Sequence, residues 1–209
     1  MSKKILIAKI IRAIAVPAAW VSVLLAVLYL FRPNIFNTIY ELLLSIAFLA
    51  IIPMAAYALQ PFIPKYKEKG HEGKRSLAFI FTFFGYTAAI LFGILAQTTT
   101  ELLFIFIVYF LSYLALLIFN KVLKFRASGH ACGSLGPITL LIYFIGWHFI
   151  VTGIILLGLV CWASLFLQRH TVKELMGGFA SFVIAFLCSL VIMCDIVNIQ
   201  TLSQPFFWH

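Results

Sequence analysis

The chain has 209 residues, of which 64% are hydrophobic and only 10% are charged, and its mean hydropathy is +1.12. A water-soluble domain is about half apolar and about a quarter charged, so this composition excludes a soluble fold and indicates a polytopic membrane protein. The formal net charge of +9 does not indicate a nucleic-acid partner, because nucleic-acid-binding proteins carry basic patches on soluble surfaces. In a membrane protein the same excess marks loop topology and contact with anionic lipid headgroups.

The apolar runs predict an all-α bundle of about seven membrane-spanning helices, with about six as the alternative, because a span needs roughly 20 mostly apolar residues. The expected spans cover residues 11–31, 37–59, 77–96, 102–119, 131–146, 148–167 and 175–195. The fifth is short, and Gly146-Trp147-His148 is a tight place to turn. A tilted or partly re-entrant hairpin is the alternative there.

No internal repeat or low-complexity linker divides the chain, so we expect one integral membrane domain over residues 1–209. Helices 11–31 and 37–59 are expected to act as scaffold for a core over about 60–195. Gln204–His209 is expected to be an interfacial aromatic anchor. The four cysteines (Cys132, Cys161, Cys188 and Cys194) have no C-x-x-C spacing, so buried, reduced thiols are expected rather than a disulfide or metal framework.

Three short polar segments interrupt the apolar chain, at residues 65–75, 124–130 and 168–174. With seven crossings they fall on one side of the membrane together with the N-terminus, and Arg32 is the one cation left on the other side. This bias predicts a multi-pass protein of the cell membrane whose polar segments face the cytoplasm. Cations retained to bind phosphate would produce the same bias.

The third segment contains His170 and, four residues later, Glu174, a spacing that puts both on one helix face. A carboxylate beside an imidazole orients the ring and stabilises the imidazolium, which prepares a nucleophilic or general-base histidine. The alternative is an interfacial histidine with a helix-end ion pair.

The second segment ends in Ser128-Gly129-His130, just before an apolar run. Helix N-termini bind anions, serine is a good N-cap, and glycine lets a ligand approach the backbone. An ordinary capped helix start is the alternative. In the first segment, Lys74 and Arg75 are candidate phosphate clamps, and a solvated basic loop is the alternative.

In order and spacing, the three segments resemble the type 2 phosphatidic acid phosphatase (PAP2) superfamily of membrane phosphatases. That family shows Lys-x6-Arg-Pro, then Pro-Ser-Gly-His, then Ser-Arg-x5-His-x3-Asp. The resemblance runs from Lys67 to about Gly178. The second motif matches over 127–130, and the third matches over 163–174.

The resemblance implies a helical membrane core and a metal-independent mechanism without a cofactor. His170 would be the nucleophile, oriented by Glu174, and His130 would protonate the leaving oxygen and then activate water. The implied phosphate ligands are Ser128, Gly129, Lys67, Lys74 and Arg75. Arg126 and Arg169, which are absent from the family pattern, are further candidate phosphate ligands.

The chain departs from the family pattern at several positions. Ser164 stands where the third motif has its arginine, and Ala127 replaces the proline before Ser128. Arg75 is one place late in the first motif, and Glu174 replaces aspartate. Arg126 and Arg169 are candidates to compensate for the missing arginine.

The expected function is hydrolysis of a lipid phosphate or pyrophosphate, isoprenoid or phosphatidic-acid-like, at the membrane interface. The expected partners are membrane lipids and the phosphorylated lipid substrate, and a homo-oligomer is compatible with the sequence. One alternative is a catalytically impaired relative that binds anionic lipid phosphates. Another is a small transporter or channel subunit, which predicts ionisable residues in the middle of spans; almost none are present.

Overall fold

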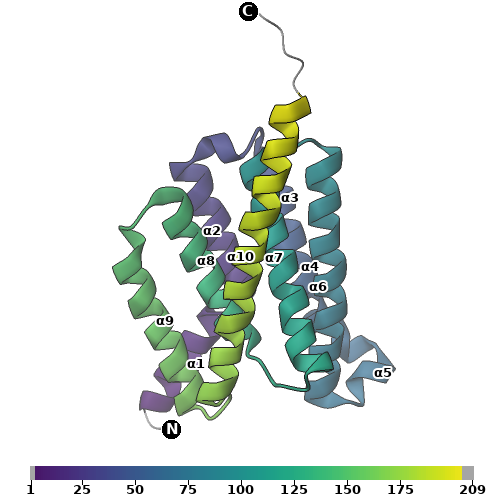
Figure 1. Cartoon of the computed structure of the whole chain (residues 1–209). Helices are drawn as coiled ribbons and strands as arrows, with labels where there is room; N and C mark the ends of the chain where they lie inside the picture. The colour runs from purple at the N-terminus through teal and green to yellow at the C-terminus, as the bar shows by residue number, and fades with distance from the viewer. Residues whose placement is uncertain (1–2, 204–209) are drawn as a thin grey trace, which may run out of the picture.

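Every regular element in the part of the chain that the computed structural model describes is helical (Figure 1). That part is the backbone of residues 3–203 with all side chains except those of residue 71 and residues 196–203; the expected anchor at 204–209 lies outside it. The main helices are α1 (Lys3–Ile14), α2 (Pro17–Phe31), α3 (Ile39–Ile46), α4 (Ile52–Leu59), α6 (Gly70–Leu95), α7 (Thr100–Leu117), α8 (Gly129–Ile145), α9 (Phe149–Phe166) and α10 (Val172–Ser203). Two π-helical turns, η2 (Ala47–Ile51) and η4 (Ile118–Val122), join α3 to α4 and extend α7. The connections contain η1 (Pro33–Ile35), η3 (Gln60–Phe62) and α5 (Pro64–Lys67).

Five of the described helical segments are long and apolar enough to cross a membrane: Ile39–Phe62, Glu72–Leu95, Thr100–Val122, Phe149–Phe166 and Val172–Asp195. The bent pair α1 and α2 makes a sixth if it counts as one span. Helix α8 is apolar but has 17 residues, fewer than a full span. The all-helical fold with membrane-type helices is confirmed, whereas seven crossings stay a prediction.

The first expected span is not one helix. Helices α1 and α2 meet at an angle of 57°, because Pro17 occupies the first turn of α2 and the residue before it is extended, with Val16 at φ −70° and ψ 142°. Proline disfavours the helical conformation in the residue that precedes it. The bend lets α2 pack against α8 while α1 packs against α9.

Helix α10 packs against α7 and α8, and α6 packs against α4 and α7, so these helices enclose an apolar core (Figure 1). The outer faces are also apolar: Leu30, Leu95 and Val151 are 73%, 81% and 67% exposed. Such a surface is unfavourable in water and suits contact with lipid chains.

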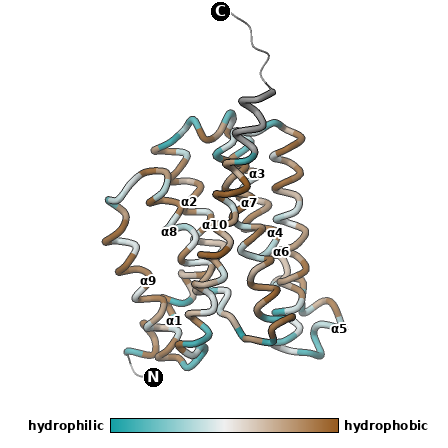
Figure 2. Tube along the Cα trace, in the orientation of Figure 1, coloured by the Kyte–Doolittle hydropathy of each residue, from teal (hydrophilic) through white to brown (hydrophobic). Residues whose placement is uncertain are grey.

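The three polar segments lie at the same end of the bundle as the N-terminus of α1, and Figure 2 shows hydrophilic residues gathered there. We call this the polar end. Arg32 lies at the opposite end, where its Nη1 donates to the carbonyl oxygen of Phe144 in the last turn of α8 at 2.6 Å.

Candidate functional site

Helix α8 begins at the polar end with a capped first turn. Ser128 is the N-cap residue, and its Oγ accepts from the amide of Ala131 at 3.3 Å. The amide of Ser128 donates to the carbonyl oxygen of Glu174 at 2.8 Å. The start of α8, which carries Gly129 and His130, is therefore attached to the start of α10.

Two glycines allow this close approach. A Cβ on Gly178 would lie 2.3 Å from the carbonyl oxygen of Ser128, and a Cβ on Gly177 would lie 2.3 Å from the Phe125 ring. Any larger residue would separate α10 from the segment that precedes α8.

Helix α10 begins with a reciprocal cap between Thr171 and Glu174. The Glu174 amide donates to Thr171 Oγ1 at 3.2 Å, and the Thr171 amide donates to Glu174 Oε2 at 3.3 Å. This is the capping box that a Thr-x-x-Glu sequence favours. It fixes the Glu174 carboxylate at the helix start.

The same carboxylate holds His170. His170 Nδ1 lies 2.8 Å from Glu174 Oε2, and an ionised carboxylate can only accept, so Nδ1 carries the proton in this contact. The lone pair of the neutral ring is then on Nε2. Arg126 Nε lies 3.6 Å from Glu174 Oε1, but the Arg126 side chain is 59% exposed, so this second ion pair is weak.

His130 lies beside His170, with the ring centroids 6.5 Å apart. Burial, followed by the charges of Arg12 and His170, lowers the pKa of His130 to about 4. Burial also lowers the pKa of His170 below its usual 6.5, since the hydrogen bond that His170 donates to Glu174 only partly opposes burial and the charge of Arg12. Both imidazoles are therefore neutral at neutral pH when the site is empty.

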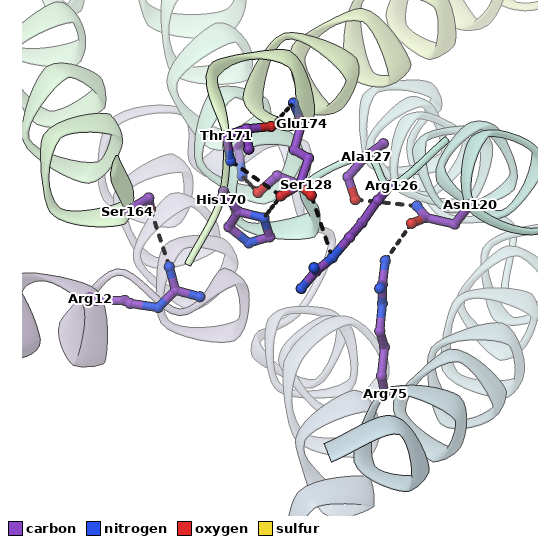
Figure 3. A network of polar contacts seen from close by, with 11 residues as sticks. Arg12, Arg75, Asn120, Arg126, Ala127, Ser128, Ser164, His170, Thr171 and Glu174 are labelled. Atoms are coloured by element: carbon purple, nitrogen blue, oxygen red, sulfur yellow. Dashed lines mark hydrogen bonds and ion pairs between the residues drawn. The ribbon is translucent and has the colours of Figure 1, made fainter. Parts of the chain in front are cut away.

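The two histidines open into a cavity of about 660 Å³ at the polar end. Its described lining includes five cations, Arg12, Lys74, Arg75, Arg126 and Arg169, and one carboxylate, Glu72. Figure 3 shows the guanidinium groups of Arg12 and Arg126 on either side of His170, and both charges act on its imidazole. An excess of cations around a partly enclosed space favours a polyanionic ligand such as phosphate.

Asn120, which lies in η4, connects two walls of the cavity. Its Oδ1 accepts from Arg75 Nη2, and its Nδ2 donates to the carbonyl oxygen of Ala127 at 3.3 Å (Figure 3). The same Nδ2 also donates to the carbonyl oxygen of Leu116 at 2.8 Å. These bonds orient the Arg75 guanidinium toward the second polar segment. Short π-helical turns such as η4 occur often at functional sites.

Arg12 reaches the cavity from α1. Its Nη1 donates to Ser164 Oγ at 3.3 Å (Figure 3). Neither Arg12 nor Asn120 was among the site residues expected from the sequence. Asn120 is a polar residue at the end of an apolar run, whereas nothing local marks Arg12 among the cations of the first helix.

The expected site residues divide into two groups. His130, His170, Gly129, Lys74, Arg75, Arg126 and Arg169 line the cavity. Ser128, Glu174 and Lys67 are absent from its described lining. Ser128 is fully buried, with its hydroxyl accepting from the backbone of α8, and Glu174 acts on the cavity through His170.

The cysteines and the acidic residues form no further site in the described chain. All four cysteines are unpaired, but the expected burial holds only for Cys132: Cys161 is half-buried, and Cys188 and Cys194 are exposed on α10. Among the described residues, no group of three or more His, Cys, Asp or Glu side chains is placed to hold a metal ion.

Comparisons of the chain with protein-family models, with curated proteins and with solved structures find no match. The resemblance to the type 2 phosphatidic acid phosphatase superfamily rests on the sequence motifs alone.

Proposed function

We propose that the protein is a divergent type 2 phosphatidic acid phosphatase that hydrolyses a lipid phosphate or pyrophosphate at the membrane interface. The observation that carries the proposal is the pairing of His170 Nδ1 with the Glu174 carboxylate at 2.8 Å, in a cationic cavity that also holds His130. A nucleophile oriented by a carboxylate, with a second acid–base group nearby, is the arrangement that covalent catalysis needs.

In the first step, His170 Nε2 attacks phosphorus and the bond from phosphorus to the leaving oxygen breaks. His130, as imidazolium, donates a proton to that oxygen, so an alcohol or a phosphate leaves. The Glu174 carboxylate stabilises the positive charge that develops on His170. A bound phosphate also places negative charge beside His130, which raises its pKa and favours the protonated form that the step requires.

In the second step, neutral His130 takes a proton from water as the water oxygen attacks phosphorus. The phosphorus–nitrogen bond to His170 breaks, inorganic phosphate forms, and His130 ends protonated for the next cycle. Guanidinium and ammonium groups around the cavity balance the charge on the phosphoryl oxygens throughout. The residues thus supply the charge stabilisation that the proposal requires without a metal.

The substrate is proposed to be a lipid because the cavity continues from the polar end into the apolar bundle. Beyond the cations its lining is mainly aromatic and aliphatic: Phe79, Tyr86, Val108, Tyr109, Tyr113, Leu116 and Phe182. A phosphorylated headgroup would bind at the cations while the adjoining chain occupies this apolar part. An isoprenoid or phosphatidic-acid-like lipid matches that division.

The proposal includes about seven crossings, with α1 and α2 as one bent span and α8 as a short one, and a polar end that faces the cytoplasm. With seven crossings, two, four and six spans separate the N-terminus from the three polar segments, and these even numbers put all three on the same side of the membrane as the N-terminus. The excess of cations there favours the cytoplasmic orientation. In a variant without the four native cysteines, a single cysteine at exposed Lys69 or Trp147 is labelled with a membrane-impermeant thiol reagent in intact and in permeabilised cells. We expect labelling at residue 147 in intact cells and at residue 69 only after permeabilisation; the reverse pattern would contradict the orientation.

The second candidate function is binding of an anionic lipid phosphate without hydrolysis. The observation that favours it is Ser164, a buried serine at the position of the family arginine. Loss of an uncompensated transition-state contact costs roughly 10²–10³ in rate. Such a protein would retain the lipid and release no phosphate.

The two candidates are separated by phosphate release from purified protein in detergent with EDTA, using isoprenoid phosphates, isoprenoid pyrophosphates and phosphatidic acid. We expect release from at least one lipid, abolished by His170→Ala and by His130→Ala. His148→Ala is the matched control, because His148 is exposed in the turn at the opposite end of the bundle. Lipid binding without release from any substrate would refute the enzyme and support the binding protein.

A further inference from the structure

We propose that Arg12, from the N-terminal helix, supplies the phosphate-binding arginine that the third motif lacks at position 164. The inference rests on the proposed function and assigns a site residue to a segment that the sequence indicated as scaffold. It would make α1 part of the phosphate site.

The first support is a direct contact between the two positions. Arg12 Nη1 donates to Ser164 Oγ at 3.3 Å across 152 residues of sequence. Ser164 is 1% exposed, so its short side chain leaves room that the Arg12 guanidinium occupies. The cation therefore reaches the motif position from another helix.

The second support is the path of the chain. The break before Pro17 turns α1 by 57° from α2 and lays it against α9, the helix that carries Ser164. Arg12 lies in the last turn of α1, close to the bend and at the cavity. If α1 continued straight along the axis of α2, it would not lie along α9.

The third support is the charge environment of Arg12. Among the described residues no carboxylate forms an ion pair with it, and the charged neighbour that acts on it is another cation, Arg169. The contact with Ser164 uses one of the five N–H donors of the guanidinium. A half-buried arginine with free donors and no counter-ion beside a second arginine is suited to bind two oxygens of a phosphoryl group.

The fourth support is the position of Arg12 relative to the reacting groups. Its charge acts on both His130 and His170, and Figure 3 shows its guanidinium directed toward the space beside His170. In that space it would contact the phosphoryl group during attack by Nε2. Arg126, on the other side, has a side chain that is 59% exposed, whereas Arg12 is half-buried, so Arg12 is better placed than Arg126 to replace the missing arginine.

The test is a reciprocal exchange. Arg12→Ser, Ser164→Arg and the double variant Arg12→Ser/Ser164→Arg are compared with wild type for kcat/KM and for inhibition by inorganic phosphate. Arg12→Ser is expected to reduce kcat/KM by about a hundredfold or more and to weaken phosphate inhibition. The double variant is expected to recover at least about tenfold of the loss, since it returns an arginine to the same space from the family position.

Two controls distinguish binding from folding. Lys4→Ala removes an exposed cation from the same helix and is expected to keep wild-type activity. Arg12→Lys keeps the charge but loses bidentate hydrogen bonding. It is expected to retain thermal stability, with activity between that of wild type and that of Arg12→Ser. Activity of Arg12→Ser equal to that of Lys4→Ala would overturn the inference while leaving the proposed function intact.

If wild type releases no phosphate, the proposed hydrolysis fails and equilibrium binding of inorganic phosphate decides the Arg12 inference. Weaker binding by Arg12→Ser than by Lys4→Ala, restored in the double variant, would support it. Equal phosphate binding by Arg12→Ser and Lys4→Ala would refute it.

Discussion

The amide of Ser128 donates to the carbonyl oxygen of Glu174 at 2.8 Å and so joins the first turns of α8 and α10. His130 follows Ser128 by two residues, and His170 precedes Glu174 by four. This one backbone bond thereby holds together the two helix starts that carry the imidazoles, whose centroids are 6.5 Å apart. The two motifs form a single site because the helix starts are attached.

Gly178→Ala is expected to separate the two helix starts. The new Cβ would lie 2.3 Å from the Ser128 carbonyl oxygen, and backbone must move to accommodate it, at a cost of about 1–3 kcal/mol. We expect a lower melting temperature in detergent and loss of phosphate release. Gly158→Ala is the matched control, because a Cβ there meets nothing within 4 Å; equal melting temperatures for the two variants would contradict the packing argument.

Glu174→Gln is expected to separate catalysis from folding. Glutamine also serves in a capping box, so the melting temperature should stay near that of wild type. The charge that orients and stabilises His170 is lost, and kcat should fall by about a hundredfold or more. Glu174→Ala removes the cap as well, which costs about 1 kcal/mol. A fully active Glu174→Gln enzyme would show that the carboxylate has only the capping role.

The pH profile of kcat should fall on the acid side, because catalysis needs neutral His170, while bound phosphate keeps His130 protonated in the substrate complex. Arg12→Ala removes a cation that lowers the pKa of His170, so the acid limb should move to higher pH. Glu174→Gln removes a carboxylate that raises it, so the limb should move to lower pH. If the two variants moved the acid limb in the same direction, the opposite effects assigned to Arg12 and Glu174 on the pKa of His170 would be wrong.

The same pKa shifts affect folding stability. The folded-state pKa values of His130 and His170 lie below the unfolded value of 6.5, so the unfolded chain binds more protons as pH falls through about 6.5. Stability should therefore decrease from pH 7 to pH 5. The decrease should be smaller in a His130→Gln variant. Thermal melts at pH 7 and pH 5 measure the decrease for wild type and for the variant. If the two proteins lose the same stability, His130 is not buried in its neutral form.

Gln168→Gly is expected to stabilise the protein by about 1 kcal/mol. Gln168 has φ +52°, and the amides of Gln168 and Arg169 donate to the carbonyl oxygens of Leu165 and Ser164 at the end of α9. This is a Schellman motif in which glycine is the favoured residue at the left-handed position. Gln168→Val should destabilise instead, because a branched side chain is poorly tolerated at positive φ. Melting temperatures that order the two variants the other way would contradict this reading.

Local sequence patterns predict much of the fold and part of the site. Apolar runs locate the helices because a membrane helix must be apolar along its length. The spacing of His170 and Glu174 indicated their contact, but the expected reason, a shared helix face, is wrong: His170 precedes α10, and the capping box at Thr171 directs the Glu174 carboxylate to it. The Thr171–Glu174 capping box could also have been read from its Thr-x-x-Glu spacing, which marks the start of α10.

Two features of the structure could not be predicted from local sequence. Pro17 makes a break at Val16 possible, but proline inside an apolar run is compatible with either a kinked span or two helices, and tertiary packing decides between them. The contact of Arg12 with Ser164 joins residues 152 apart, and no local pattern distinguishes Arg12 from the other cations near it. The sequence favours Arg126 and Arg169 as replacements for the motif arginine, because they are nearer in sequence, whereas the packing of α1 against α9 brings Arg12 to that position.

A covalent phosphohistidine at His170 can be trapped directly in a His130→Ala variant. An aryl phosphate with a good leaving group needs no proton from residue 130 in the first step, whereas the second step still lacks its base. We expect an acid-labile, alkali-stable phosphoryl group to accumulate on His170, located by mass spectrometry, and to be absent from His130→Ala/His170→Ala. If wild type turns over the same substrate but no phosphoryl group is found on His170 in the His130→Ala variant, His170 is not the nucleophile.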